Sequence, residues 1–185
     1  NADIIIACMH WGTEYRTTAN SEQEKLADFL FENGVDIIIG NHPHVLEQME
    51  KRTVTLEDGT TKEGFVIYAL GNFIADQNAA NTRNSIILDL TVTKHTDGTV
   101  SVDKAEYTPI YMYKNKSVQK HKMKLIDIER SIMDYESGVD TSITSNGRGN
   151  LLRIKDGDGN TLMMISTQTS EDGDNVTSKY YLQSS

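Results

Sequence analysis

The amino-acid sequence predicts an α/β fold in which a β-α-β unit is followed by antiparallel strands. Two isoleucine-rich apolar runs, residues 3–10 and 35–39, enclose a segment with the periodicity of a helix. A strand–helix–strand order of this kind joins two parallel strands through a crossover connection. Further along the chain, alternating apolar and polar residues are separated by Asp-Gly turns, the pattern of antiparallel hairpins. With 185 residues, the chain is long enough to bury a core.

Capping signals delimit the helix between the two apolar runs. Ser21 stands three residues before Glu24, which predicts a capping box with Ser21 as the N-cap. Gly34 follows the periodic segment at the place where a C′ glycine ends a helix. The apolar positions at helical spacing are Leu26, Phe29 and Leu30.

A first hairpin is predicted by residues 53–56 and 64–70, which flank the turn signal Asp58-Gly59. Residues 45–51, just before it, fit either a short helix or the entry to a strand.

A second hairpin follows. Residues 85–94 alternate between apolar and polar side chains, which predicts a half-buried antiparallel strand. The returning strand over residues 100–113 is expected to break near Pro109, because proline cannot donate to a strand ladder.

The C-terminal part is predicted to contain a helix over residues 124–135, ending at Gly138, and then a hairpin. The hairpin turn, residues 156–160, also resembles the start of a calcium loop. Thr161 and Thr167 stand where such a loop needs a glycine and a glutamate, so a plain turn is the favoured interpretation.

Composition excludes some classes of function. The chain has 18 basic and 27 acidic residues, a net charge of −9, and no basic cluster, so we expect no nucleic-acid partner. Cys8 is the one cysteine, so an intrachain disulfide is excluded, and its place in an apolar strand predicts a small core residue. No apolar run approaches the ~20 residues of a membrane-spanning helix.

Histidines follow both strands of the β-α-β unit. His10 ends the first apolar run, and His42 and His44 follow the second, with Pro43 restricting the backbone between them. The carboxyl ends of parallel strands share one edge of a sheet, where ligands of such sheets bind. Neutral imidazole is the commonest metal ligand among side chains, so the three histidines predict a metal site. The alternative is surface histidines beside a turn proline.

Two further side chains are candidates for this site. Glu14 lies close behind His10 and is a candidate carboxylate that orients an imidazole from outside the ligand set, or else a solvated loop acid. Asn72 follows a third apolar strand in a Gly-Asn turn. It is a candidate donor to a substrate oxyanion, or else an asparagine that simply suits a tight turn.

Three stretches of this sequence, in their order and spacing, resemble the capsule-synthesis protein CapA family, which includes the poly-γ-glutamate capsule proteins of bacteria. They are Met9-His10-Trp11-Gly12-Thr13-Glu14-Tyr15, Gly40-Asn41-His42-Pro43-His44-Val45, and Tyr68-Ala69-Leu70-Gly71-Asn72-Phe73-Ile74 with Asp76-Gln77. The resemblance covers roughly residues 2–110 and extends, more distantly, to the calcineurin-like metallophosphoesterases.

That resemblance implies a metallophosphoesterase-like α/β sandwich with metal ligands on loops at strand ends. His10 matches the lone late histidine of the phosphoesterase pattern. His42 and His44 match its Gly-x-x-His or Gly-His-x-His type of motif, here with Asn41 inserted where others carry a small residue. Such enzymes hold two divalent ions (zinc, manganese or iron) that bind a bridging hydroxide. This sequence lacks the Asp-x-His, the bridging aspartate and the Asn-His pair of the pattern.

We therefore expect residues 1–113 to be the C-terminal half of the family domain and residues 114–185 a divergent extension. The missing N-terminal half would be a partner, and the chain by itself is expected to self-associate through the sheet it leaves uncovered.

Two functions follow from the resemblance. One is a metal-dependent phosphohydrolase-like protein of capsule or poly-γ-glutamate synthesis, which the histidines favour. The other is a non-catalytic accessory subunit of a cell-envelope polymer synthesis and export complex, in contact with membrane subunits. Both imply the bacterial cell envelope, at its extracytoplasmic face.

Overall fold

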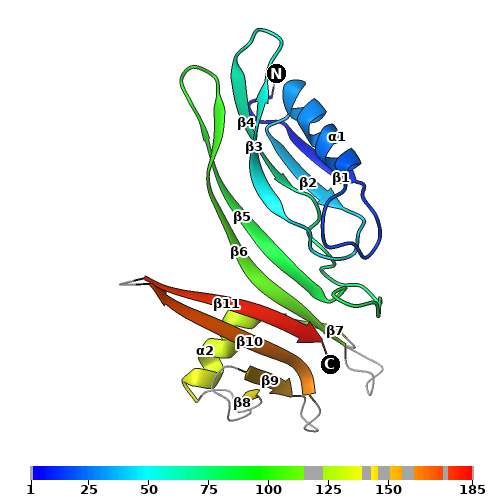
Figure 1. Ribbon diagram of the computed structural model, residues 1–185, viewed down its shortest axis with the longest axis vertical. Coiled ribbons are helices and arrows are strands. Elements are labelled where there is room, and N and C mark those ends of the chain that lie inside the picture. The colour runs from blue at the N-terminus through cyan, green and yellow to red at the C-terminus, as the bar shows by residue number, and fades with distance from the viewer. Residues whose placement is uncertain are drawn as a thin grey trace. The chain divides into compact units, whose positions relative to one another are not determined.

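The computed structural model describes residues 2–114, 123–138, 143–145, 151–155, 161–172 and 175–184, with side chains described up to residue 138 except at Tyr135. The chain forms two compact units, Asn1–Met112 and Tyr113–Ser185 (Figure 1).

The first unit is built on a four-stranded sheet with the strand order β1-β2-β4-β3. Its strands are β1 (Ile6–His10), β2 (Ile37–Asn41), β3 (Met49–Thr55) and β4 (Thr61–Ile67), and the helix α1 (Ser21–Glu32) connects β1 to β2. β1, β2 and β4 run parallel, whereas β3 pairs with β4 as an antiparallel hairpin. The predicted α/β class, the β-α-β unit and the first hairpin are confirmed.

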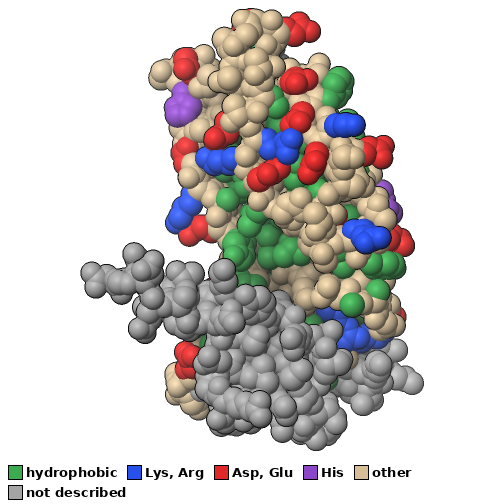
Figure 2. Space-filling model, viewed as in Figure 1, with side chains coloured by type: hydrophobic (Ala, Val, Ile, Leu, Met, Phe, Trp, Pro, Cys, Tyr) green, Lys and Arg blue, Asp and Glu red, His purple; other side chains and the backbone are tan. Residues whose placement is uncertain are grey.

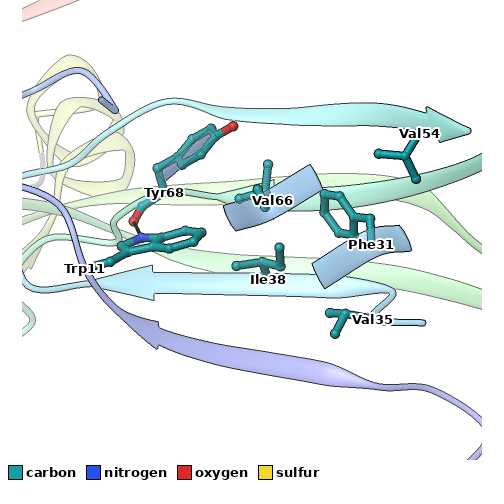
Figure 3. Packing of buried hydrophobic residues seen from close by; sticks show 8 residues of the cluster. Trp11, Phe31, Val35, Ile38, Val54, Val66 and Tyr68 are labelled. Atoms are coloured by element: carbon teal, nitrogen blue, oxygen red, sulfur yellow. Dashed lines mark hydrogen bonds between the residues drawn. The ribbon is translucent and has the colours of Figure 1, made fainter. Parts of the chain in front are cut away.

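Side chains alternate across this sheet, so β2, β3 and β4 each contribute to two apolar clusters, whereas β1 contributes only to the first. On the face covered by α1, Ile38 and Val66 meet Phe31 (Figure 3). Residues of the opposite face pack with the antiparallel pair β5 (Asn84–Lys94) and β6 (Val100–Lys114). The first cluster comprises Trp11, Ala27, Phe31, Val35, Ile38, Val54, Val66 and Tyr68, and the second Ile37, Phe65, Ile67, Ile86 and Val102. The unit therefore has a helix layer, a sheet and a second β layer.

The N-cap of α1 is Asn20, so the prediction of Ser21 is wrong by one residue. The Asn20 side chain accepts hydrogen bonds from the backbone N–H groups of Glu22 and Gln23, both at 3.0 Å. The Gln23 side chain accepts in return from the Asn20 N–H at 2.9 Å. Asparagine caps at least as well as serine, and the shifted box satisfies the same orphan donors. At the other end Gly34, at a φ of +97°, follows the C-cap as expected.

The face that α1 buries also differs from the expected one. The buried positions are Gln23, Ala27 and Phe31, whereas Phe29 is 56% exposed. Leu26 and Leu30 pack against the edge of the cluster. The buried residues of α1 therefore recur every four positions. They lie on a neighbouring face of the helix from the one that Leu26, Phe29 and Leu30 indicated.

β1 is an edge strand, which changes the environment of its residues. Ile6 is 56% exposed and Cys8 is an exposed free thiol, so the expectation that Cys8 is a core residue is wrong. An edge strand has a neighbour on one side only, and burial on both faces is typical of strands inside a parallel sheet.

Two further predictions need correction in the first unit. β6 continues through Pro109, which pairs with Ile86, and the register shifts instead between Thr91 and Val92. A proline is compatible with a strand wherever the ladder does not use its N–H. The open question about residues 45–51 is settled by β3, which begins at Met49.

The surface of the first unit carries both signs of charge. On the face seen in Figure 2, acidic and basic side chains are interspersed rather than segregated. Ion pairs join neighbouring elements: Arg52 with Asp28, Lys51 with Glu63, and Lys62 with Asp36.

In the second unit, a short strand precedes a helix and an antiparallel sheet. The elements are β7 (Met123–Asp127), α2 (Ile128–Glu136), β8 (Ile143–Ser145), β9 (Leu151–Lys155), β10 (Thr161–Asp172) and β11 (Asn175–Ser184). The sheet has the order β11-β10-β9-β8. The helix therefore begins four residues later than predicted, because residues 124–127 belong to β7. The hairpin is confirmed, while its turn, residues 156–160, lies outside the described residues. Neither described helix is long and apolar enough to cross a bilayer.

Candidate functional site

Three parallel strands deliver their following loops to one edge of the first sheet. His10 is the last residue of β1, and Asn41 is the last residue of β2, directly before His42. Backbone hydrogen bonds continue past the strand ends: Trp11 N–H donates to Asn41 at 3.1 Å, and Leu70 N–H to Gly40 at 3.2 Å. The loops after β1, β2 and β4 are thus held next to each other.

The three predicted histidines lie together at this edge. The ring centroids of His10 and His42 are 4.5 Å apart, and those of His42 and His44 are 6.2 Å apart. His10 is exposed, whereas His42 and His44 are partly buried. Imidazoles from two loops therefore form one cluster at the surface.

Strained backbone surrounds the same cluster. Among the described residues, four non-glycine residues have a positive φ: Tyr15 (64°), His42 (111°), His44 (61°) and Asn81 (63°). Three of them belong to the two loops that bear the histidines. The left-handed region costs roughly 1–2 kcal/mol for most residues, and such strain persists where the surroundings over-determine it, commonly at functional sites.

His44 is held by contacts on three sides. Its Nδ1 lies 3.0 Å from Asn72 Oδ1, and its Nε2 lies 3.9 Å from Glu14 Oε1. The ring of Tyr15 stacks on it with 6.3 Å between centroids, and Tyr15 N–H donates to Pro43 at 2.8 Å. The structure thus brings both Glu14 and Asn72, the two other predicted site residues, to His44.

Asn72 is buried, and its amide is fully engaged. Nδ2 lies within hydrogen-bond distance of His44 O (3.2 Å), Gln77 Oε1 (2.8 Å) and Thr82 O (3.0 Å). An amide nitrogen with three acceptors around it has no hydrogen left for a substrate. This geometry favours a role for Asn72 toward His44 over direct contact with an oxyanion.

Trp11, which directly follows His10, is buried, and its backbone N–H donates to Asn41, the residue before His42. Its Nε1–H donates to the Tyr68 carbonyl at 2.8 Å, and its ring stacks on that of Tyr68 at 5.9 Å (Figure 3). The sequence analysis assigned no role to Trp11 or Tyr15. The one feature of the sequence that could have indicated a role is that both residues belong to the same motif as His10.

A buried polar pair ties α1 to the loop that carries His44. Gln23 Nε2–H donates to Glu47 Oε2 at 2.8 Å, and both side chains are nearly inaccessible to solvent. Glu47 Oε1 is buried without a partner among the described residues. Burial raises the pKa of Glu47, and the Gln23 hydrogen bond opposes that shift.

Glu47→Gln is expected to raise the free energy of unfolding by about 1 kcal/mol at pH 7, because a buried carboxylate costs more than a buried amide. A raised pKa means that the native state holds this proton to higher pH than the unfolded chain does. The wild type therefore loses stability as the pH rises above the ordinary glutamate pKa of about 4.3 and through the raised value. The advantage of the variant should disappear near pH 4 in urea titrations. Glu57→Gln, an equal charge change at an exposed turn residue, should show no such pH-dependent gain.

The cluster fits a metal ion in the kind of donors it offers. Imidazole and carboxylate are ligands for zinc-type metals, and two ligands each about 2.1 Å from one ion lie no more than about 4.2 Å apart. Glu14 Oε1 and His44 Nε2 meet that limit at 3.9 Å. Within the described residues, however, no group of three or more histidine, cysteine or acidic side chains is arranged to hold an ion. The cluster offers pairs of donors and not a closed site.

Comparisons with known proteins give a consistent family. Residues 1–77 match the bacterial capsule synthesis protein PGA_cap family. PGA biosynthesis protein CapA of Bacillus subtilis (strain 168) is 37% identical over 123 residues, which is 65% of this chain and 30% of that protein. Capsule biosynthesis protein CapA of Bacillus anthracis is 38% identical over 88 residues, 48% of this chain and 19% of that protein. No solved structure matches the chain.

The chain thus spans less than a third of the length of either relative. The matched region contains the three histidines, Glu14 and Asn72, and the loops that bring them together. The part of the chain that carries the site is therefore similar to the bacterial capsule synthesis protein PGA_cap family and to the CapA proteins of these two Bacillus species.

Proposed function

We propose that this chain supplies part of a divalent-metal site in a capsule synthesis protein, with His10, His42, His44 and Glu14 as donors. The observation that carries the proposal is the arrangement at His44. Its Nε2 and a Glu14 carboxylate oxygen face each other at 3.9 Å, while Nδ1 is engaged by Asn72. Two acceptors that face each other across such a gap are stabilised by a cation placed between them.

The donors fall into two pairs. His10 and His42 form one, with ring centroids 4.5 Å apart, and His44 and Glu14 form the other. A two-metal site holds its ions about 3.5–4 Å apart, and each ion needs further ligands. We propose that the missing ligands come from parts of the protein outside this chain, since the relatives are far longer than the matched region.

For the whole protein we propose metal-dependent, phosphohydrolase-like chemistry in the synthesis of capsule or poly-γ-glutamate. The names of the two relatives support the capsule and PGA context, and with it an association with the cell envelope. A location at the extracytoplasmic face is part of the same proposal. The helix, sheet and β layers of the first unit are compatible with one side of a metallophosphoesterase-like sandwich.

One observation favours the second candidate, a non-catalytic accessory subunit. The described residues contain no closed group of three metal ligands. A scaffold that had lost its metal would have no need of histidines with a strained backbone, however. The positive φ values of His42 and His44 therefore favour a metal site.

Zinc and manganese titrations of the chain by calorimetry test the proposal. We expect weak binding that His42→Ala weakens at least about 100-fold, since even the loss of residues outside the ligand shell costs 10–100-fold. The chain alone should not hydrolyse aryl phosphates, because the ligands that complete the site are absent. His95→Ala is the matched control, since His95 is an exposed turn residue bound to Ser101.

Three results would contradict this proposal. Absence of zinc and manganese binding by the wild-type chain would exclude a metal role for the cluster and favour the accessory subunit. Equal affinities of the wild type and His42→Ala would place the metal elsewhere. Hydrolysis abolished by His42→Ala would show instead that the chain carries a complete site.

A further inference from the structure

We propose that Asn72 is a positioning residue that holds the His44 imidazole as the Nδ1–H tautomer. The lone pair of Nε2 then points at the gap shared with Glu14. The tautomer follows from the hydrogen bonds of the chain itself. What Nε2 binds rests on the proposed function.

The orientation of the Asn72 amide is set by its surroundings. One end of the amide lies close to three oxygen acceptors: two backbone carbonyls, of His44 and Thr82, and the side-chain carbonyl of Gln77. An NH₂ group satisfies such a position, whereas a carbonyl oxygen there would face three other oxygens. Oδ1 must therefore be the end that faces His44.

The position of Oδ1 decides where the imidazole carries its hydrogen. Oδ1 lies 3.0 Å from His44 Nδ1, and an amide oxygen can only accept. A neutral His44 that makes this hydrogen bond must donate from Nδ1, which leaves Nε2 as an acceptor. Outer partners of this kind fix the tautomer and ring orientation of metal-binding histidines in general.

The rest of the site prevents the ring from turning away from Asn72. The backbone of His44 is held at a φ of 61°, and Tyr15 stacks on the ring. Asn72 itself is only 9% exposed, and the loop that contains Gln77 and Thr82 packs around its amide. The hydrogen bond thus joins a buried, fully partnered amide to a ring with little freedom.

The position of Glu14 means that the tautomer of His44 affects metal binding. With hydrogen on Nδ1, Nε2 and Glu14 Oε1 are two acceptors 3.9 Å apart. That separation exceeds the length of a hydrogen bond, so the pair is suited to a shared cation. With hydrogen on Nε2, the same nitrogen would be unable to bind a metal. Asn72 would therefore control the ligand capacity of His44 without touching the ion.

The test is long-range ¹H–¹⁵N NMR of the histidine side chains in the metal-free chain. At about pH 8.5 the spectrum separates the two neutral tautomers of each imidazole. We expect His44 to carry its hydrogen on Nδ1 in the wild type. In Asn72→Leu, which removes the acceptor at similar volume, the Nε2–H form should gain population and zinc affinity should fall about 10–100-fold.

The variant Asn72→Asp keeps the oxygen that accepts from His44 Nδ1 and removes the NH₂ group of the amide. Its carboxylate still accepts from Nδ1, so the Nδ1–H tautomer should persist even though the hydrogen bonds to His44 O and Thr82 O are lost. This variant keeps the test decisive if Asn72→Leu fails to fold. The signals of His95, which bonds Ser101 at 2.9 Å, should not respond to either change.

Hydrogen on Nε2 of His44 in the wild type would overturn the inference. So would an unchanged tautomer in folded Asn72→Leu, or its loss in folded Asn72→Asp. The expected tautomers together with an absence of zinc binding would uphold the positioning role of Asn72 and contradict the proposed metal site alone.

Discussion

Gly40→Ala should lower the free energy of unfolding by at least about 3 kcal/mol, the upper part of the range for overpacked cores. A Cβ on Gly40 would lie 1.9 Å from the Tyr68 carbonyl oxygen and 2.6 Å from Trp11 Nε1. It would therefore occupy the space of the hydrogen bond between these two groups. The obstacle includes backbone, which cannot move aside as the end of a flexible side chain can.

Urea denaturation followed by tryptophan fluorescence measures the effect, because Trp11 is the one tryptophan and its indole lies next to Gly40. Gly59→Ala is the matched control. Gly59 has a φ of +83° with nothing within 4 Å of a new Cβ, so the substitution should cost only about 1 kcal/mol of backbone strain. Equal losses in the two variants would show that the close approach at Gly40 does not constrain the fold.

Phe31→Ala should destabilise the chain by about 3–5 kcal/mol, whereas Phe29→Ala should change the free energy of unfolding by less than about 0.5 kcal/mol. Phe31 is completely buried between α1 and the sheet, in the same cluster as Ile38 and Val66. Phe29, two residues earlier on the same helix, is 56% exposed. The two variants make the same chemical change in one helix and differ only in what the ring contacts.

Both variants are measured by urea denaturation under the same conditions. A further consequence distinguishes Phe31. Its ring lies 2.3 Å from where a Cβ on Gly64 would be, so the absence of a side chain at Gly64 is what admits the ring. Comparable losses for Phe29→Ala and Phe31→Ala would contradict the burial of α1 along the row of Gln23, Ala27 and Phe31.

Local sequence patterns determined the order and type of most elements of the first unit. Apolar runs and a capped helix predicted the β-α-β unit, and an Asp-Gly turn predicted the β3–β4 hairpin. The shared edge of His10, His42 and His44 also followed from sequence. Parallel strands must end on the same side, and the histidines directly follow the strands.

Some errors arose where two neighbouring residues fit one pattern. Asn20 and Ser21 are both good N-caps with a partner three residues on, and the Gln23 side chain decides for Asn20. Residues 124–127 fit a helical spacing but lie in β7, because short apolar segments are ambiguous between the two periods.

Only the tertiary structure decided which face of α1 is buried, since that depends on where the sheet lies and not on the helix itself. The tertiary structure also decided which residues contact His44 and its loop. Asn72, which lies next to His44, is 28 residues away in sequence, and Gln23 and Glu47, whose hydrogen bond ties α1 to the His44 loop, are 24 residues apart. No local pattern encodes a contact between such distant residues. The sequence by itself therefore determined most elements of the first unit, the family resemblance and the edge that bears the histidines. The packing of distant loops decided how His44 is oriented, because hydrogen-bond partners are set by proximity in space.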